Sequence, residues 1–287
     1  MILVIAVSYF GFEDLEPYLQ SLKVQTFEPW RLVVVDNSED DAEWDRIERW
    51  TSGDRRVLAL KAPKNLGYFG AVDWALKRVD HREVNWLIVS NTDVRLAGKD
   101  AFAELARVPM DDIGVLAPSI RSAWTGRDQN PYQVHRPTVA QMRRRRLILG
   151  NPILAQLVIL MFAVRGRITR TRRASGKVML SQSIYAAHGS FFAVSRTFLD
   201  RGGSFDFPMF LFAEELFLAE QAKDLKLQTL YAPTVRVEHM EHRQTGYLRS
   251  LEMLRCGARA AHYGYDLINA DEAGRRRLMR GDYDPRL

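Results

Sequence analysis

The first 117 residues alternate short apolar runs with amphipathic segments, and this alternation restricts the possible folds more than any other feature. Runs of about five residues, rich in β-branched side chains, predict strands at residues 2–7, 32–35, 57–60, 86–89 and 113–117. Helices are expected between them, the clearest at residues 68–79 and 101–107. Because strands that alternate with helices are joined by right-handed crossovers, the sequence predicts an α/β protein. We expect a doubly wound, mostly parallel sheet with helices on both faces, not an all-helical or all-β protein.

Polar side chains follow three successive strands of this predicted sheet. The groups are Asp36-Asn37-Ser38, Lys64-Asn65-Leu66-Gly67 and Asn91-Thr92-Asp93. Each group alone is also typical of a turn, but the carboxyl ends of parallel strands share the edge where open α/β sheets bind ligands. A hard cation such as Mg²⁺ or Mn²⁺ takes one or two protein carboxylates together with the oxygens of a bound phosphate. A metal–diphosphate site at Asp93 is therefore the first functional hypothesis.

The loop Gly67-Tyr68-Phe69-Gly70 opens the helix after the third strand, and its backbone N–H groups are suited to binding an anion. The loop after the first strand, residues 8–12, lacks the glycines of the dinucleotide fingerprint. It also lacks the glycine- and lysine-rich triphosphate loop expected of a nucleotidyltransferase. Both absences argue against those two enzyme classes.

The chain has 287 residues, of which 47% are hydrophobic and 26% are charged, a composition typical of one large or two closely packed α/β domains. Its single cysteine, Cys256, excludes a disulfide framework and a multi-cysteine zinc site, and it fits a reducing compartment. Residues 1–7 lack a basic leader and a small-residue cleavage site, so they are interpreted as a core strand. We therefore expect a cytoplasmic protein.

The net charge of +6 comes from one segment. Nine arginines and no acidic residue lie between Arg143 and Arg173, whereas the rest of the chain has 32 basic and 35 acidic residues. The apolar stretch after Pro152 is about a dozen residues long, too short for the roughly 20 that cross a bilayer. A short apolar helix flanked by arginines suits an anionic membrane surface. The alternatives are a core helix with solvated arginine ends or an arginine patch for an acidic polymer; nucleic acid is not expected, because stacking aromatics are missing.

Small and acidic residues mark two further places in the second half. Gly189 and Ser190 interrupt an apolar run, where they either admit a sugar or a backbone segment or form a simple bulge. Glu214 and Glu215 begin an apolar helix, where the helix dipole alone favours carboxylates. In an apolar cleft, one of the pair would instead have the raised proton affinity of a general base.

Two histidines, His239 and His242, follow a predicted strand at residues 234–238. Histidines at a strand end bind metal, bind phosphate or do neither. The region from about residue 246 to 280 is rich in Arg and Ala and is expected to be helical, with no sign of chemistry.

Taken together, these motifs resemble the family 2 glycosyltransferases, which are inverting nucleotide-sugar enzymes with a GT-A fold, and in particular rhamnosyltransferase-like enzymes of polysaccharide biosynthesis. The resemblance runs from residue 2 to about residue 246 and leaves the arginine-rich insertion and the last helices as variable parts. Its six motifs, in order, are Val33-Val34-Val35-Asp36-Asn37-Ser38, Asn65-Leu66-Gly67-Tyr68-Phe69-Gly70, Ser90-Asn91-Thr92-Asp93-Val94, His188-Gly189-Ser190-Phe191-Phe192, Phe212-Ala213-Glu214-Glu215 and residues 239–246.

The resemblance implies a role for each matching residue. Asp93, in the place of the last Asp of an Asp-x-Asp motif, and His239 would hold Mg²⁺ or Mn²⁺ on the donor diphosphate. Glu215 lies where the family has its catalytic base, with the adjacent Glu214 as the alternative. The nucleotide sugar would be bound by Asp36, Asn65, Gly67, Gly70, Asn91 and Gly189.

Three positions depart from the family pattern. Asn91 replaces the first Asp of the metal motif, and Phe217 and Gln221 stand where many members have an Asp and an Arg. The departures keep open a catalytically degenerate nucleotide-sugar-binding or scaffold subunit as the alternative function.

We therefore expect a metal-dependent, inverting hexosyltransferase of cell-surface glycan and cell-wall synthesis. It would move a sugar from a nucleoside-diphosphate sugar to a hydroxyl of a lipid-linked or polysaccharide acceptor. It would lie peripherally on the inner face of the cell membrane. The expected division is a nucleotide-sugar half at 1–120, a basic amphipathic insertion at 121–176, an acceptor and catalytic half at 177–245, and C-terminal helices at 246–287.

Overall fold

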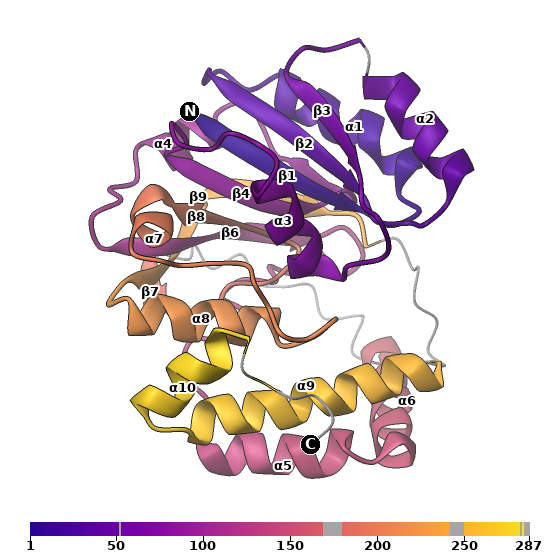
Figure 1. Ribbon diagram of the computed structural model, residues 1–287, viewed down its shortest axis with the longest axis vertical. Helices are drawn as coiled ribbons and strands as arrows, with labels where there is room; N and C mark the ends of the chain where they lie inside the picture. The colour runs from indigo at the N-terminus through magenta and orange to yellow at the C-terminus, as the bar shows by residue number, and fades with distance from the viewer. Residues whose placement is uncertain (52, 169–179, 242–249, 282, 284–287) are drawn as a thin grey trace.

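The computed structural model of the protein describes residues 1–51, 53–168, 180–241, 250–281 and 283. Figure 1 shows a twisted sheet with helices on both faces and, beyond one edge of that sheet, a separate layer of helices. Among the residues singled out from the sequence, Arg170, Arg172, Arg173 and His242 lie outside the described ranges.

Four parallel strands form the N-terminal half of the sheet, as the alternating pattern predicts. In spatial order they are β3 (Val57–Lys61), β2 (Trp30–Asp36), β1 (Ile2–Ser8) and β4 (Trp86–Asn91). In β1, Leu3 and Ile5 belong to one hydrophobic cluster, whereas Ile2 and Val4 belong to the other. Both faces of the strand are therefore buried, which explains why its sequence is a continuous apolar run.

Beyond β4 the sheet is mixed. The next strands are β8 (Phe191–Ser195), β6 (Ile113–Ser122), β9 (Gln228–His239) and β5 (Val94–Leu96), and β7 (Gln182–Ile184) also pairs with β9. β8 runs antiparallel to both of its neighbours, whereas β9 runs parallel to β6. The α/β prediction is confirmed, but the strand predicted at residues 113–117 does not pair with β4. β8, which comes later in the chain, lies between them.

Helices cover both faces of the sheet. On one face, α1 (Phe12–Lys23), α2 (Asp41–Thr51) and α4 (Ala101–Ala106) contribute to one hydrophobic cluster. On the other, α3 (Tyr68–Leu76), α7 (Arg196–Asp200) and α8 (Glu214–Asp224) contribute to the second cluster. The doubly wound arrangement expected from the sequence is therefore present.

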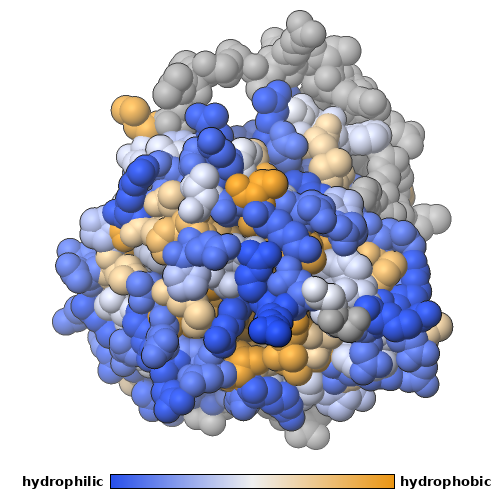
Figure 2. All heavy atoms as spheres, turned by 90° about the horizontal axis from the view of Figure 1, so that it is seen from above, coloured by the Kyte–Doolittle hydropathy of each residue, from blue (hydrophilic) through white to orange (hydrophobic). Residues whose placement is uncertain are grey.

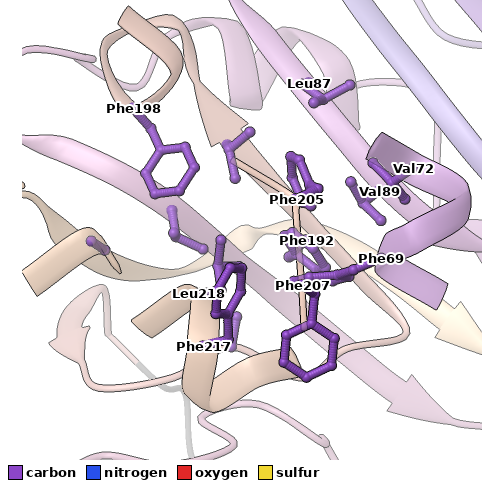
Figure 3. Close-up of a cluster of buried hydrophobic side chains, with 14 of the residues drawn as sticks. Phe69, Val72, Leu87, Val89, Phe192, Phe198, Phe205, Phe207, Phe217 and Leu218 are labelled. Atoms are coloured by element: carbon purple, nitrogen blue, oxygen red, sulfur yellow. The ribbon is translucent and has the colours of Figure 1, made fainter. Parts of the chain in front are cut away.

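A group of buried phenylalanines joins α3 to α8 (Figure 3). The ring of Phe69 in α3 lies 5.1 Å from that of Phe205 and 6.3 Å from that of Phe217 in α8, centroid to centroid. Edge-to-face pairs of this kind add about 0.5–1.5 kcal/mol to the stabilisation from burial. Phe217 is thus a core residue, and Gln221 exchanges two hydrogen bonds with the backbone of Ser204. The departures from the family pattern at Phe217 and Gln221 therefore both have structural roles here.

The arginine-rich insertion and the C-terminal helices pack together as one layer (Figure 1). The layer consists of α5 (Val139–Leu149), α6 (Pro152–Ile168), α9 (Leu251–Asn269) and α10 (Glu272–Met279). α5 and α6 both pack on α9, and α10 contacts α8. A cap formed by Thr138 and Gln141 starts α5, because each side chain bonds the backbone N–H of the other.

A buried ion-pair network connects this layer to α8. The Glu220 carboxylate is fully buried and accepts hydrogen bonds from Nε and Nη2 of Arg136, at 2.7 and 2.9 Å, and from the Tyr185 hydroxyl, at 2.6 Å. Arg275 of α10 lies 3.4 Å away. Although burial opposes its charge, these hydrogen bonds lower the pKa of Glu220. The network fixes the middle of α8 relative to the chain segment that enters α5.

One face of α6 is apolar and exposed. Ile153, Leu154, Leu157 and Met161 are between 46% and 73% exposed, and their helical spacing places them on one side. This excludes the core-helix alternative for the described part of α6.

By contrast, the face seen in Figure 2, opposite the helical layer, is largely hydrophilic with small separate apolar spots. No helix within the described ranges is long and apolar enough to span a membrane.

Candidate active site

Asp93 and His239 meet at the end of β4, as the sequence-based assignment requires. Asp93 follows β4 in a short turn, and His239 ends β9, where it pairs with Val94. The Nε2 atom of His239 lies 3.3 Å from Oδ1 of Asp93. Nδ1 of His239 lies 2.8 Å from Oε1 of Gln129, whose amide nitrogen donates to Glu241. Gln129 thus accepts from Nδ1–H and orients the ring so that Nε2 points toward Asp93.

These two side chains fit a divalent cation that is shared with a substrate. A carboxylate oxygen and an imidazole nitrogen converge on one point, and no group of three or more His, Cys, Asp or Glu residues suited to a metal occurs among the described residues. Mg²⁺ and Mn²⁺ accept such incomplete protein sites when phosphate oxygens and water supply the other ligands. Asn91 ends β4 two residues before Asp93, and its backbone N–H donates to the Ser190 carbonyl.

The predicted nucleoside side of the site lies at the ends of β2 and β3. Asp36 is 1% exposed; its Oδ1 accepts from the Ser38 N–H, whereas its Oδ2 has no hydrogen-bond partner among the described residues. The Asn37 side chain donates to Asn65 Oδ1 and to the Gly67 carbonyl, at 2.9 and 3.1 Å. Asn65 and Gly67 are thus brought beside Asp36. Asn37, quoted in the motif but given no role, is the residue that ties them together.

Gly67 has a steric reason to be glycine. Its φ is +72°, and a Cβ built there would lie 1.9 Å from the carbonyl oxygen of Phe210. The loop before α3 can therefore lie against the loop before α8 only without a side chain at this position. Gly70 differs, because its Cβ would make only an ordinary contact with Leu66.

Glu214 and Glu215 start α8 after two residues in left-handed conformation. Phe212 and Ala213 have φ of +71° and +70°, a strained arrangement typical of functional sites. Burial raises the pKa of Glu215, an effect opposed by backbone hydrogen bonds, including one from Gly189, and by the charge of Arg145. Burial and the neighbouring Glu215 raise the pKa of Glu214 to about 8. At neutral pH, Glu214 is therefore largely protonated.

Gly189 lies against Glu215. A Cβ at this position would approach Oε1 of Glu215 to 2.8 Å, so glycine is what allows the carboxylate to reach the start of β8. The sequence placed Gly189 among the nucleotide-sugar-binding residues; its observed contact is with the candidate base.

Three aromatic residues without an assigned role surround the site. The buried hydroxyl of Tyr68 has no hydrogen-bond partner among the described residues. Burial raises the pKa of Tyr68, and nearby groups, including Glu214, Glu215 and Asp93, raise it further. The candidate base and metal ligand therefore lie within electrostatic reach of one hydroxyl. The rings of Tyr132 and His188 are 5.5 Å apart, and burial lowers the pKa of His188 to about 4. His188 is neutral at physiological pH.

A pocket of about 240 Å³ opens beside Glu215. Its walls come from the segment after β6, from α5 and from the start of α8, and they include Tyr132, Gln141, Arg145 and Glu215. Glu215 lines this pocket, whereas Glu214 does not. The geometry therefore favours Glu215 over Glu214 as the residue that faces a second substrate.

The mixed sheet, with Asp93 and His239 close together after β4 and two carboxylates at the start of a later helix, fits a glycosyltransferase with a GT-A fold. The sequence profile of glycosyl transferase family 2 matches residues 3–203, and the chain belongs to this family. The expected family, fold and transferase class are therefore confirmed.

Relatives agree with this assignment. The chain is 27% identical over 255 residues, covering 85% of this chain and 77% of the relative, to an N-acetylglucosaminyl-diphospho-decaprenol L-rhamnosyltransferase of Mycobacterium tuberculosis. Its fold is similar to that of the mannosyltransferase PcManGT from Pyrobaculum calidifontis in complex with GDP-Man and Mn²⁺, at a TM-score of 0.57 and 16% identity over 98% of this chain and 68% of that one. GalNAc-T7 with UDP, GalNAc and Mn²⁺ gives a TM-score of 0.63 at 15% identity over 94% and 50% of the two chains.

Replacing Gly189 with Ala is expected to lower the transfer rate roughly 10- to 100-fold, because the new methyl group must displace the carboxylate of Glu215. Gly257→Ala is the control, since a Cβ meets nothing within 4 Å there. Steady-state kinetics and thermal melting of both variants check the prediction. An active Gly189→Ala protein, or one whose loss of activity only follows a loss of folding, would contradict it.

Proposed function

We propose that this protein transfers a sugar, with inversion, from a nucleoside-diphosphate sugar to a hydroxyl of a lipid-linked acceptor in cell-surface glycan synthesis. The observation that carries this proposal is the position of Glu215, which lines an open pocket together with Tyr132. The Tyr132 ring contacts His188, and the His188 ring in turn contacts His239 of the Asp93–His239 pair. The M. tuberculosis relative, whose name specifies a rhamnosyl donor and a diphospho-decaprenol-linked acceptor, supports the substrate class.

In the proposed reaction, Glu215 accepts the proton of the acceptor hydroxyl as its oxygen attacks the anomeric carbon. A new carbon–oxygen bond forms on one face of the sugar while the bond to the diphosphate breaks on the other. The nucleoside diphosphate leaves with the electron pair of that bond. Raised proton affinity suits Glu215 to this task, and the mostly protonated Glu214 remains beside it as a hydrogen-bond donor.

Asp93 and His239 would hold Mg²⁺ or Mn²⁺, and the metal would offset the charge that develops on the leaving diphosphate. The two Mn²⁺-containing structures with similar folds support this choice of ion. Asp36, Asn65 and Gly67 would bind the nucleoside, with Asn91, Gly70 and the Gly189 segment nearer the sugar. The buried Oδ2 of Asp36 is an acceptor available to a donor group of the base or ribose.

The direct test is transfer from a panel of nucleoside-diphosphate sugars, with an L-rhamnose donor first, to a synthetic diphospholipid-linked N-acetylglucosamine in the presence of Mn²⁺ or Mg²⁺. Formation of a disaccharide lipid with inverted anomeric configuration supports the proposal. Metal-dependent nucleotide binding without transfer from any donor would overturn it in favour of a degenerate binding subunit.

We also propose that α5 and α6 hold the protein on an anionic membrane surface. Arg143 and Arg144 are exposed on α5, close in sequence to the exposed apolar face of α6. Basic residues near an anionic bilayer contribute about 1 kcal/mol each, and the apolar face contributes by burial in the interface.

Replacing Ile153 and Leu157 together by Ser is expected to reduce flotation with anionic liposomes by at least roughly tenfold, because two exposed aliphatic groups no longer enter the interface. Arg143→Ser combined with Arg144→Ser should act more weakly and lose its effect at high salt. Leu58→Ser is the control, since Leu58 is 47% exposed on the distant strand β3. Equal flotation of all variants would contradict membrane binding through this layer.

A further inference from the structure

The arginine-rich helix α5 also forms one wall of the pocket that Glu215 faces. Gln141 and Arg145 are four residues apart, so they lie on the same side of the helix, and both line the pocket. Tyr132 and Glu215 form other parts of the lining. The basic segment therefore does more than present charge to solvent, because one of its arginines lies at the candidate catalytic centre.

The electrostatics of the pocket favour an anionic ligand next to the candidate base. Arg145 forms no ion pair with any described residue, although its positive charge lowers the proton affinity of the nearby Glu215. The helical cap uses Oε1 of Gln141, so the Nε2 hydrogens are that side chain's remaining donors. A guanidinium, an amide N–H₂ group and the Tyr132 hydroxyl thus offer hydrogen-bond donors around one cavity.

Apolar surface begins where this wall ends. Leu147, two residues after Arg145, is 63% exposed, and the apolar face of α6 follows it. Because a helix rises about 1.5 Å and turns about 100° per residue, Leu147 lies about 3 Å further along the axis than Arg145 and on nearly the opposite side of α5. An acceptor whose phosphate binds at Arg145 would therefore reach these exposed aliphatic side chains only with a hydrocarbon chain long enough to pass around or beyond α5.

We propose that this pocket is the acceptor subsite and that Arg145, assisted by Gln141 and Tyr132, binds the diphosphate of a polyprenyl-diphosphate-linked sugar. The sugar hydroxyl then lies toward Glu215, and the long lipid chain extends past the end of α5 toward the exposed apolar face of α6. The inference rests on the proposed transferase function and specifies its acceptor: the diphosphate, and not the sugar alone, is recognised. Arginine suits this task, because its planar donors match phosphate oxygens in pairs.

Kinetics with three acceptors test the inference. The acceptors are a short-chain, water-soluble sugar diphospholipid, the same sugar on an alkyl glycoside without phosphate, and a long-chain diphospholipid in liposomes. Arg145→Gln is expected to raise KM for the short-chain diphospholipid roughly 10- to 100-fold, the effect of losing a charged hydrogen bond. KM for the donor and the slow rate with the alkyl glycoside should not change.

Arg145→Lys should recover part of the lost affinity, because it keeps the charge without the paired donors. Arg277→Gln, the same substitution on the exposed side of α10, is the control and should match wild type.

If the wild type is active and Arg145→Gln has an unchanged KM for the short-chain diphospholipid, the inference is overturned and the proposed function stays intact. A defect confined to liposomes would also overturn it, since Arg145 would then contact the membrane rather than the acceptor. Absence of transfer by the wild type would instead refute the proposed function.

Discussion

Replacing Glu215 with Gln is expected to lower the rate of sugar transfer by about 10³-fold while nucleotide-sugar binding stays unchanged. The amide keeps the size of the carboxylate and its contact with Gly189, but it cannot accept the proton of the acceptor hydroxyl. Single-turnover rates, together with donor affinity from calorimetry, separate loss of chemistry from loss of binding.

Glu214→Gln is the matched control, one residue away on the same helix. Because its pKa of about 8 leaves Glu214 mostly protonated at neutral pH, a neutral amide resembles its working state, and activity should stay within about tenfold. If Glu214→Gln were the inactive variant and Glu215→Gln the active one, the assignment of the base would be reversed.

The same assignment predicts how activity depends on pH. A base with a raised pKa is protonated, and so inactive, over a wider range of acidic pH. The rate of the wild type should therefore fall on acidification at a pH above the usual range for a glutamate. A neutral His188, whose pKa is about 4, does not contribute a competing step near neutrality.

Replacing Asp93 with Ala is expected to abolish the stabilisation of the protein by Mn²⁺ with a nucleoside diphosphate and to reduce transfer roughly 10²- to 10³-fold. The reason is that the variant loses the carboxylate that lies 3.3 Å from His239, and ionic contacts with the metal contribute several kcal/mol. Thermal melting with and without Mn²⁺, EDTA and nucleotide measures the first effect, and steady-state kinetics the second.

Asn91→Ala, two positions earlier on the same strand end, is the matched control. It should lower the transfer rate and the stabilisation by Mn²⁺ much less than Asp93→Ala, because it removes no charge. EDTA should make the wild type resemble Asp93→Ala in nucleotide binding. Nucleotide binding by Asp93→Ala that still depends on Mn²⁺ would show that the metal lies elsewhere.

Local sequence patterns predicted those strands and turns whose formation depends on residues that are close together along the chain. The strands β1 to β4 and the polar residues that follow them lie where the apolar runs and turn residues indicated. The meeting of Asp93 with His239 came from family resemblance, since the pairing of β5 with β9 joins residues about 145 positions apart along the chain. No local pattern encodes such a pairing, nor the insertion of β8 between β4 and β6.

The contacts that sequence reasoning missed join segments that are distant along the chain. Asn37 shapes the loop around Asn65 and Gly67, and Gly189 makes room for Glu215; in both cases the partner lies at least 26 residues away. The run of arginines at 143–146 is uniform in sequence, yet only Arg145 lines the pocket. Which member of the run lies at the pocket depends on how α5 packs on α9, and composition does not report this.

The buried bridge between Arg136 and Glu220 has a consequence for catalysis. Arg136 lies just before α5, and Glu220 lies five residues after Glu215 on α8, so one rigid link connects both walls of the pocket. The distance between the base and the donors on α5 is therefore set when the chain folds, before any acceptor arrives. Such preorganisation means that little ordering free energy has to be spent when the acceptor binds, and more of the binding energy remains to align its hydroxyl with the sugar.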